Sequence, residues 1–292
     1  MNRQQGMALL TVLLMVAMMT ALVVASQRTW QSALQRTSAQ QFSLQAGWTL
    51  YGAEQWLRAA PAPPNAGFDS LQLDTQRVNL RWRDAQACFN LNALARPGRR
   101  DDEGQLQPTL AQQLFQRLLE NAGQPPAQAA AITQQLHRML NPDETPRPPA
   151  MMDEQRRLMS RLPPDQRRHL APSLCLLPTP QLSISVNGLQ PHQAPLLVAL
   201  LDNRFSEEQA RQHIAARPAS GWQHLADLFA DQTGKAAQEN ETFVSLARFT
   251  SEYWQLTLWL DEAPYQAVQR SLWQWTAGAL MLIHREYGVS EE

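Results

Sequence analysis

Residues 7–26 read MALLTVLLMVAMMTALVVAS, an apolar run that contains no glycine, proline or charged residue. A helix of about 20 apolar residues spans the roughly 30 Å hydrocarbon layer of a membrane. The run is longer than the core of a cleavable secretory signal, and Ala25-Ser26-Gln27 is a poor signal-peptidase site. Arg3 and the amino group precede the run, which favours a cytoplasmic N-terminus. We therefore expect one membrane helix that stays attached to the chain.

The helical pattern continues beyond the membrane segment. Neither glycine nor proline interrupts residues 7–46, and three prolines within residues 61–64 end the pattern. A helix over residues 7–59 would be about 80 Å long at 1.5 Å per residue. We predict that its second half packs against the rest of the protein through a face formed by Trp30, Leu34, Thr37, Leu44, Trp48 and Tyr51. The alternative is a break at Gly47, with an anchor and a separate helix.

Alternating patterns predict strands in two distant parts of the chain. Residues 61–70 have the composition of a loop, and residues 77–83 then alternate apolar and polar side chains. The arginines on the polar side of that strand fit a solvated face better than a nucleic-acid site. Residues 253–260 alternate in the same way, and residues 265–276 and 279–287 can supply two more strands.

The residues between these strands read as helices. Helical patterns cover residues 108–140, 151–177, 195–201, 206–216 and 221–230. The sequence therefore predicts an α+β fold, in which a long N-terminal helix packs on a small antiparallel sheet and a large all-α insert separates the strands of that sheet.

Composition excludes several classes of function. The chain has 25 Lys+Arg against 26 Asp+Glu, so its net charge of -1 provides no general attraction for nucleic acid. Two cysteines exclude a disulfide-dense scaffold and a multi-cysteine metal site. The six histidines are scattered, and the sequence lacks the H-E-x-x-H, G-x-S-x-G and Walker signatures. We therefore predict that the protein is not an enzyme.

Residues 3–11, RQQGMALLT, resemble the leader of type IV pilins and type II secretion pseudopilins. The resemblance implies that a prepilin peptidase cuts between Gly6 and Met7 and that Met7 is N-methylated. The family usually has glutamate five residues after the cut, where this chain has Thr11. That carboxylate neutralises the amino group of a neighbouring subunit, so a subunit without it suits the terminal position of a fibre. A chance glycine before a plain membrane anchor is the alternative.

Residues 84–94, DAQACFNLNAL, resemble the segment with which K-type minor pseudopilins enter their helical insert. Residues 183–187, SISVN, resemble the entry to their second helical unit, so the resemblance covers nearly the whole chain in order. It implies an insert of SAM-like or helix–hairpin–helix units, with one such turn around residues 217–222. Asn90 and Asn92 are expected to satisfy backbone groups of turns.

The resemblance also implies a division of the chain into successive parts. These parts are the leader 1–6, the transmembrane segment 7–27, the periplasmic half of the helix 28–60, the first part of the sheet 61–94, a helical insert 95–250 with units at about 95–178 and 183–250, and the C-terminal strands 251–292.

The implied function is that of a minor pseudopilin in a type II secretion system. Such a subunit caps the tip of the periplasmic pseudopilus and helps to initiate its assembly, for export of folded proteins across the outer membrane. The implied partners are the I-type and J-type minor pseudopilins, the major pseudopilin, the prepilin peptidase and the inner-membrane secretion platform. The implied location is the inner membrane, with a single pass and a periplasmic C-terminal domain.

Two other functions compete with this one. A pilin-like or membrane-anchored helix–hairpin–helix protein could bind nucleic acid, but Glu207, Glu208 and Asp227 give the 206–230 region the wrong charge, and we expect no nucleic-acid partner. A membrane-anchored periplasmic enzyme is the third candidate, and no catalytic motif supports it.

Two further expectations depend on the periplasmic location and on the resemblance. Cys88 and Cys175 would meet an oxidising compartment, so we expect a disulfide bond rather than two buried thiols. K-type pseudopilins commonly bind calcium through an acidic loop, whose counterpart here supplies the candidate ligands Asn141, Asp143 and Glu144. Because this loop is short and rich in proline, we expect the calcium site to be weakened or lost and no other cofactor to be bound.

Overall fold

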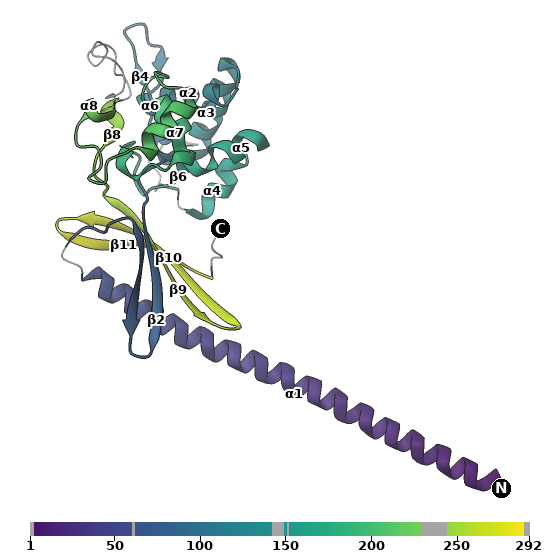
Figure 1. Ribbon diagram of the computed structural model, residues 1–292. Coiled ribbons are helices and arrows are strands. Elements are labelled where there is room, and N and C mark those ends of the chain that lie inside the picture. Colours follow the sequence, from purple (N-terminus) through teal and green to yellow (C-terminus); the bar gives the residue numbers. More distant parts are fainter. Residues whose placement is uncertain (1–2, 60–61, 142–148, 151, 229–243, 289–292) are drawn as a thin grey trace.

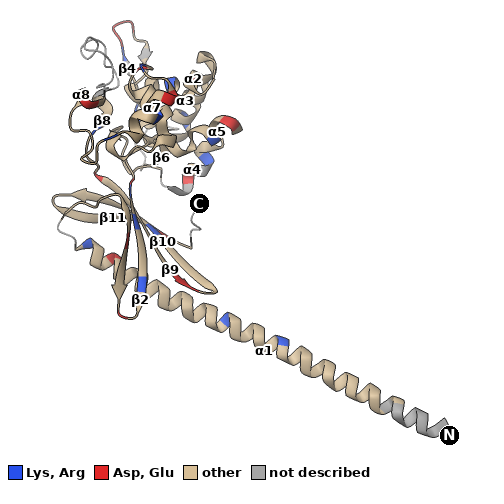
Figure 2. Cartoon of the chain, in the orientation of Figure 1, with Lys and Arg blue, Asp and Glu red and all other residues tan. Residues whose placement is uncertain are grey.

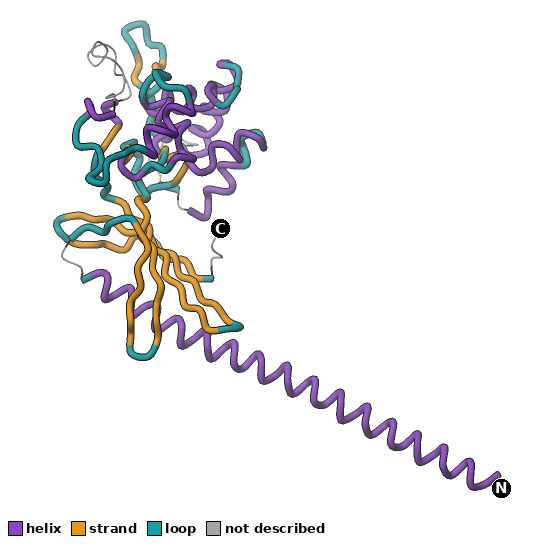
Figure 3. Tube along the Cα trace, viewed as in Figure 1, coloured by secondary structure: helices purple, strands orange, loops and turns teal. Residues whose placement is uncertain are grey.

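The computed structural model describes residues 3–59, 62–141, 149–150, 152–228 and 244–288, and these form a long helix, a sheet and a helical head (Figure 1). Helix α1 (Arg3–Arg58) runs without a break through Gly47, which confirms the continuous helix. At 1.5 Å per residue it is about 84 Å long. The sheet lies along its C-terminal part, and the head lies beyond the sheet on the side away from α1 (Figure 3).

The sheet has five antiparallel strands in the order β1-β2-β9-β10-β11. The long strands β9 and β10 form its centre, and β1 and β11 form its edges. The strands are β1 (Gly67–Leu73), β2 (Gln76–Asp84), β9 (Tyr253–Glu262), β10 (Tyr265–Thr276) and β11 (Ala279–Tyr287). The helical head is inserted between β2 and β9, so hydrogen bonds between these two strands close the sheet across most of the chain.

The prediction of a loop over residues 61–70 is wrong from Gly67 onward, because β1 begins there. Most side chains of β1 are exposed, and only Leu71 and Leu73 among its apolar residues are half-buried. An edge strand with so little burial has almost no alternating pattern to detect. Its pairing with β2 along its whole length, from Gly67 opposite Trp82 to Leu73 opposite Gln76, stabilises it instead.

Helix α1 packs on one face of the sheet, but not through the face that the sequence indicated. The packed residues are Phe42, Ala46, Leu50, Ala53 and Leu57, and they meet Val78, Leu80, Leu256, Leu258 and Trp273. The apolar residues of the predicted face point to solvent instead: Trp30, Leu34, Leu44, Trp48 and Tyr51 are 41–74% exposed. The two alanines keep the helix close to the sheet, where the larger tryptophans would hold it away.

The helical head has its own hydrophobic core, separate from the core between α1 and the sheet. Its α-helices are α2 (Leu110–Asn121), α3 (Pro126–Leu140), α4 (Met152–Met159), α5 (Pro164–Leu170), α6 (Ala194–Leu200), α7 (Glu207–Ala215) and α8 (Leu225–Leu228). Capping boxes at Thr109 and Ser206 determine where α2 and α7 begin. Helix α6 is buried on all sides and lies at the centre of the head.

Short strands and single-turn helices connect these elements. The strands are β3 (Phe89–Asn90), β4 (Arg99–Arg100), β5 (Leu106–Gln107), β6 (Leu174–Cys175), β7 (Ile184–Ser185) and β8 (Ala247–Arg248). The 3-10 turns are η1 (Leu91–Ala95), η2 (Ala171–Ser173), η3 (Val186–Gly188), η4 (Pro191–Gln193) and η5 (Val244–Leu246). Strand β3 pairs with β6 and β7 pairs with β8, both in parallel.

Candidate functional site

The N-terminal part of α1 projects away from the rest of the molecule. From Leu10 to Val24 its large apolar side chains are 47–71% exposed wherever the structure describes them. Figure 2 shows no charged residue along this stretch, and the first one that follows is Arg28. The helix is therefore long and apolar enough to cross a membrane.

The predicted processing residues all lie at the start of this helix. Gly6 and Met7 belong to its first turns, and Thr11 follows one helical turn after Met7. Their side chains lie outside the described residues, so cleavage, methylation and the role of Thr11 stay predictions.

A second apolar surface runs along α1 beyond the membrane-length segment, on the side away from the sheet. It is formed by Trp30, Leu34, Leu44 and Trp48, with Tyr51 at its edge beside Arg285 of β11, and we call it the outer stripe. The most exposed of these side chains is Trp48, at 74%, although a tryptophan usually buries most of its surface. Exposed apolar surface of this extent marks a place where another polypeptide or a membrane binds.

An ion pair between a buried glutamate and a half-buried arginine joins α1 to the last strand of the sheet. Glu54, which is fully buried, accepts a hydrogen bond from Arg285 of β11. Burial alone would lower the pKa of Arg285, but the hydrogen bond and the charge of Glu54 raise it above the ordinary arginine value. The guanidinium also lies 5.4 Å from the ring centre of Tyr51. Sequence reasoning missed this pair, although Glu54 is the first acidic residue of the chain and the only one in α1.

Removing Arg285 is expected to destabilise the attachment of α1 strongly. In Arg285→Met the Glu54 carboxylate stays buried without its partner, which should lower the free energy of unfolding by about 3–5 kcal/mol. Denaturant unfolding of the full chain in detergent, followed by tryptophan fluorescence, measures this change. The double variant Glu54→Gln, Arg285→Met should recover most of the loss, and an equally unstable double variant would contradict the explanation.

Two asparagines, each just after a short strand of the head, form hydrogen bonds with backbone groups of distant segments. Asn92, which follows β3, donates to the carbonyls of Ala150 and Leu177 and accepts from the amide of Ala150, at 2.8–2.9 Å. Asn187, which follows β7, donates to the carbonyls of Trp222 and Phe249 and accepts from the amide of Trp222, at 2.8–2.9 Å.

The sequence predicted that Asn90 and Asn92 satisfy backbone groups, and the structure confirms this for both side chains. Asn90 caps η1 by accepting from the Asn92 amide at 3.2 Å, and the other partners are more distant than expected. Asn90 accepts from the Leu177 amide at 3.0 Å and donates to the Thr179 carbonyl at 2.7 Å, so it connects residues almost 90 positions apart.

Each asparagine is expected to stabilise the head through three hydrogen bonds. Asn92→Ala should lower the free energy of unfolding by about 3 kcal/mol, at roughly 1 kcal/mol per bond, and Asn187→Ala by a similar amount. Asn79→Ala, on the polar face of β2, is the matched control and should stay within about 0.5 kcal/mol of the parent chain. Thermal unfolding of the three variants compares them, and equal losses in all three would rule out a special role for the two asparagines.

The structure joins Cys88 and Cys175 in a disulfide bond, with their Cα atoms 5.9 Å apart. The bond lies beside the β3–β6 pair, in which Cys175 is opposite Asn90. It therefore connects the start of the head to the end of its first helical part, at the side that faces the sheet.

A half-buried carboxylate lies where the chain passes from β2 into the head. Burial raises the pKa of Asp84, while hydrogen bonds from the Ser185 hydroxyl at 2.5 Å and the Gln86 amide at 2.8 Å act in the opposite direction. Gly188 must be glycine here, since a Cβ at this position would collide with the Asp84 carboxylate. This crossing is therefore closely packed and polar.

The residues around the predicted helix–hairpin–helix turn are used inside the protein. Arg217 donates to the carbonyls of Val186 and Leu189 and stacks over Trp222 at 5.4 Å. Arg211 of α7 pairs with two glutamates of the same helix. These arginines therefore stabilise the head and are not held free for phosphate.

The candidate calcium ligands are not brought together in the described part of the chain. Asn141 is the C-terminal capping residue of α3, and its side-chain nitrogen donates to the Ala95 carbonyl at 3.4 Å. Asp143 and Glu144 lie outside the described residues. Across the described ranges, His, Cys, Asp and Glu form no group of three or more that could hold a metal.

Comparisons with known proteins agree with this architecture. Residues 87–179 and 184–247 match two family models, both described as type II secretion system protein K. The type II secretion system protein K of Klebsiella pneumoniae is 32% identical and covers 99% of this chain and 98% of its own length. A putative type II secretion system protein K of Escherichia coli K12 is 31% identical over 76% of this chain and 77% of its own.

A solved structure also has a similar fold. One chain of the GspK–GspI–GspJ complex from enterotoxigenic Escherichia coli aligns with a TM-score of 0.69 at 23% identity. The alignment covers 87% of this chain and all of that one. The full-length sequence match and the two family models together show that this chain belongs to the type II secretion system protein K family, the K-type minor pseudopilins.

Proposed function

We propose that this chain caps the tip of a periplasmic pseudopilus and helps to start its assembly. The observation that carries the proposal is α1: its first half is exposed and apolar, and its second half has the sheet on one side and the outer stripe on the other. The first half would lie in the inner membrane and the outer stripe would pack against neighbouring subunits, with the head on the periplasmic side.

The shape of the molecule and Thr11 support the terminal position. The sheet and the head both lie at the C-terminal end of α1, and the head extends well beyond it (Figure 1). A head of this width is hard to place inside a shaft, where each subunit has neighbours on all sides. Thr11 removes the carboxylate that a subunit would offer to the amino group of the subunit above it.

The partners that fit this role are other pseudopilins. A related protein is found in a complex with GspI and GspJ, and we propose that I-type and J-type subunits pack against the outer stripe of this chain. The major pseudopilin, the prepilin peptidase and the inner-membrane platform would act on it during maturation and growth of the fibre.

We further propose that the head contains two related SAM-like units, at about 95–178 and 183–250. Each would follow a short strand and a 3-10 turn, β3–η1 and β7–η3, and each of these strands pairs in parallel with a later strand. Asn92 and Asn187 make the same set of three hydrogen bonds in the two places. The repeated pattern supports a duplicated unit.

The role we propose is assembly without catalysis. The conspicuous polar side chains of the head, Asn90, Asn92, Asn187 and Arg217, are all engaged with backbone carbonyls or amides. Side chains used in this way stabilise a fold and are not available to a substrate.

Complementation tests the proposed function. In a strain without its own protein K, the full chain should restore secretion, and the I-type and J-type subunits should co-purify with it. Trp48→Glu places a charge in the outer stripe without touching the sheet, so it should reduce co-purification at least tenfold while the protein stays folded. Gln55→Glu, a half-buried position of the same helix, is the control. Full secretion and unchanged co-purification by the Trp48 variant would contradict the proposal.

Thr11→Glu should be tolerated if the chain is the terminal subunit. A carboxylate at this position would have no subunit above it to neutralise, and it could be accommodated beside the chain's own amino group one turn away. Secretion by the variant in the same strain should be within twofold of the parent chain. A loss of tenfold or more would show that Thr11 lies in a packed position inside the fibre.

A further inference from the structure

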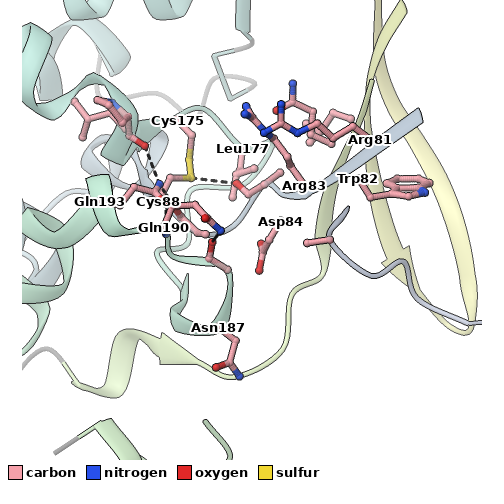
Figure 4. A pocket seen from close by; sticks show the side chains of 18 of the residues that line it. Arg81, Trp82, Arg83, Asp84, Cys88, Cys175, Leu177, Asn187, Gln190 and Gln193 are labelled. Atoms are coloured by element: carbon pink, nitrogen blue, oxygen red, sulfur yellow. Dashed lines mark hydrogen bonds between the residues drawn. A yellow bond between two sulfur atoms is a disulfide. The ribbon is translucent and has the colours of Figure 1, made fainter. Parts of the chain in front are cut away.

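A cleft of about 800 Å³ separates the outer face of the sheet from the helical head. On the sheet side it is lined by Arg81 and Arg83 of β2 and Arg270 of β10, and on the head side by Arg217 and the Cys88–Cys175 disulfide. Figure 4 shows Arg81 and Arg83 on one side, with the two cysteines and Gln193 on the other. Among the described residues that line it, four arginines face one carboxylate, that of Asp84.

The arginines of the sheet are arranged at regular positions. Arg81 and Arg83 are two residues apart on β2, so they share the face turned away from α1 and their Cα atoms are about 6.6 Å apart. Arg81 is opposite Thr257, and Thr257 is opposite Arg270, so these two arginines are separated by two strand spacings, about 9.5 Å. The sheet therefore presents a rigid array of positive charge.

Two of these arginines have no acidic partner within the protein. In the described part of the chain neither Arg81 nor Arg270 forms an ion pair, and the Nε atom of Arg270 is buried without a hydrogen-bond partner. Arg81 is held over the ring of Phe68, 4.6 Å from its centre. An unsatisfied buried donor is costly, and a carboxylate is the anion that a guanidinium binds through two parallel hydrogen bonds.

Asp84 does not neutralise this array. Its carboxylate accepts from the Ser185 hydroxyl and the Gln86 amide at the junction with the head, and burial raises its pKa. The cleft is therefore open to an anion from outside the molecule.

We propose that this cleft binds an extended acidic segment of a second polypeptide, with Arg81 and Arg270 receiving its carboxylates. In an extended peptide, residues two apart lie on one side and are about 6.6–6.8 Å apart, the same repeat as Arg81 and Arg83. Acidic residues on one side of such a segment would therefore reach Arg81 and then Arg270, about 9.5 Å away across the sheet, in a groove to whose positive charge Arg83 adds. The site is separate from the outer stripe, so it does not depend on the proposed packing of α1.

The aromatic lining favours a peptide over single-stranded nucleic acid. Nucleic-acid channels need free rings on which bases can stack. Of the three aromatic residues among the lining, Trp82 is buried on the α1 side of β2, one face of the exposed Phe68 ring is covered by Arg81, and His192 lies on the head side. The arginines, by contrast, are placed for charge-assisted hydrogen bonds.

Fluorescence anisotropy of the full chain in neutral detergent tests the proposal. The probe is a fluorescein-labelled heptapeptide of alternating glycine and glutamate, and the competitors are its glutamine counterpart and a ten-nucleotide oligothymidine. The glutamate peptide should bind, and its binding should weaken as salt is raised. Its affinity should be at least tenfold higher than that of either competitor. Arg81→Gln, Arg270→Gln should raise its dissociation constant at least tenfold.

Arg77→Gln is the matched control, because Arg77 lies on the same strand and face as Arg81 but outside the cleft, and it should change the dissociation constant less than twofold. The charge-reversed variant Arg81→Glu, Arg270→Glu should lose the glutamate peptide and gain a glycine–lysine peptide, which shows that it is folded. Equal losses in the Arg77 and Arg81/Arg270 variants, stronger binding of oligothymidine, or no binding of the glutamate peptide would each overturn the proposal.

Discussion

Gly6→Leu is expected to leave the chain uncut between Gly6 and Met7 and to abolish its activity in secretion. The family resemblance places a peptidase cut after this glycine, and a bulky side chain there would block it. The uncut leader keeps Arg3 and the original amino group ahead of the apolar run. Because burying those charges among the membrane helices of a fibre costs several kcal/mol, the chain could not take its place in the assembly. Mass spectrometry of the purified chain and a secretion assay measure the two effects.

Gly52→Leu is the matched control for this experiment. Gly52 lies in the same helix and is exposed, and a Cβ there would have nothing within 4 Å. This variant should therefore be processed and should support secretion, as the parent chain does. If Gly6→Leu were also cut and secretion continued, or if the parent chain carried an intact Met1, the glycine before the apolar run would have no role in maturation.

Loss of the disulfide is expected to have the largest effect on stability. In Cys88→Ala, Cys175→Ala the unfolded chain is no longer constrained by a closed loop across 87 residues. In the chain-entropy model this lowers the free energy of unfolding by about 4–5 kcal/mol. The head should be affected most, because the bond lies beside the β3–β6 pair that connects its beginning to the end of its first helical part.

Unfolding of the full chain in detergent, with and without a reducing agent, checks this value. A reducing agent should destabilise the parent chain by the same amount as the double substitution and should leave the double variant unchanged. An equal unfolding midpoint in the parent chain and the variant would contradict the prediction. Secretion by the variant should fall with the fraction of folded head, since the proposed assembly role needs the head intact.

Much of the fold could be predicted because its signals are local. The long apolar run and the lack of proline specify α1, and strict alternation specifies β2 and β9. Both patterns depend only on neighbouring residues and on the burial of one face. The hydrogen-bonding role of Asn90 and Asn92 could be predicted from the local sequence for the same reason, but their distant partners could not be predicted.

Features that depend on residues far apart in the chain could not be predicted in this way. Strand β1 lies at the edge and has little apolar alternation of its own, so its pairing with β2 determines it. From the sequence, the arginines of β2 are interpreted as an ordinary solvated face. The structure shows that Arg270 of β10 and Arg217 of the head line the same cleft. The buried Glu54 is explained only by its ion pair with Arg285, which lies 231 positions later in the chain.

The sequence by itself determined that the helix continues well beyond its membrane-length apolar run and that a sheet is divided by a helical insert. Only the tertiary structure decided which side of that helix the sheet covers. Helical spacing predicts stripes, and α1 carries two of them. The sheet packs on the stripe that contains Ala46 and Ala53, because small side chains allow close approach, and Trp30 and Trp48 stay exposed on the other side.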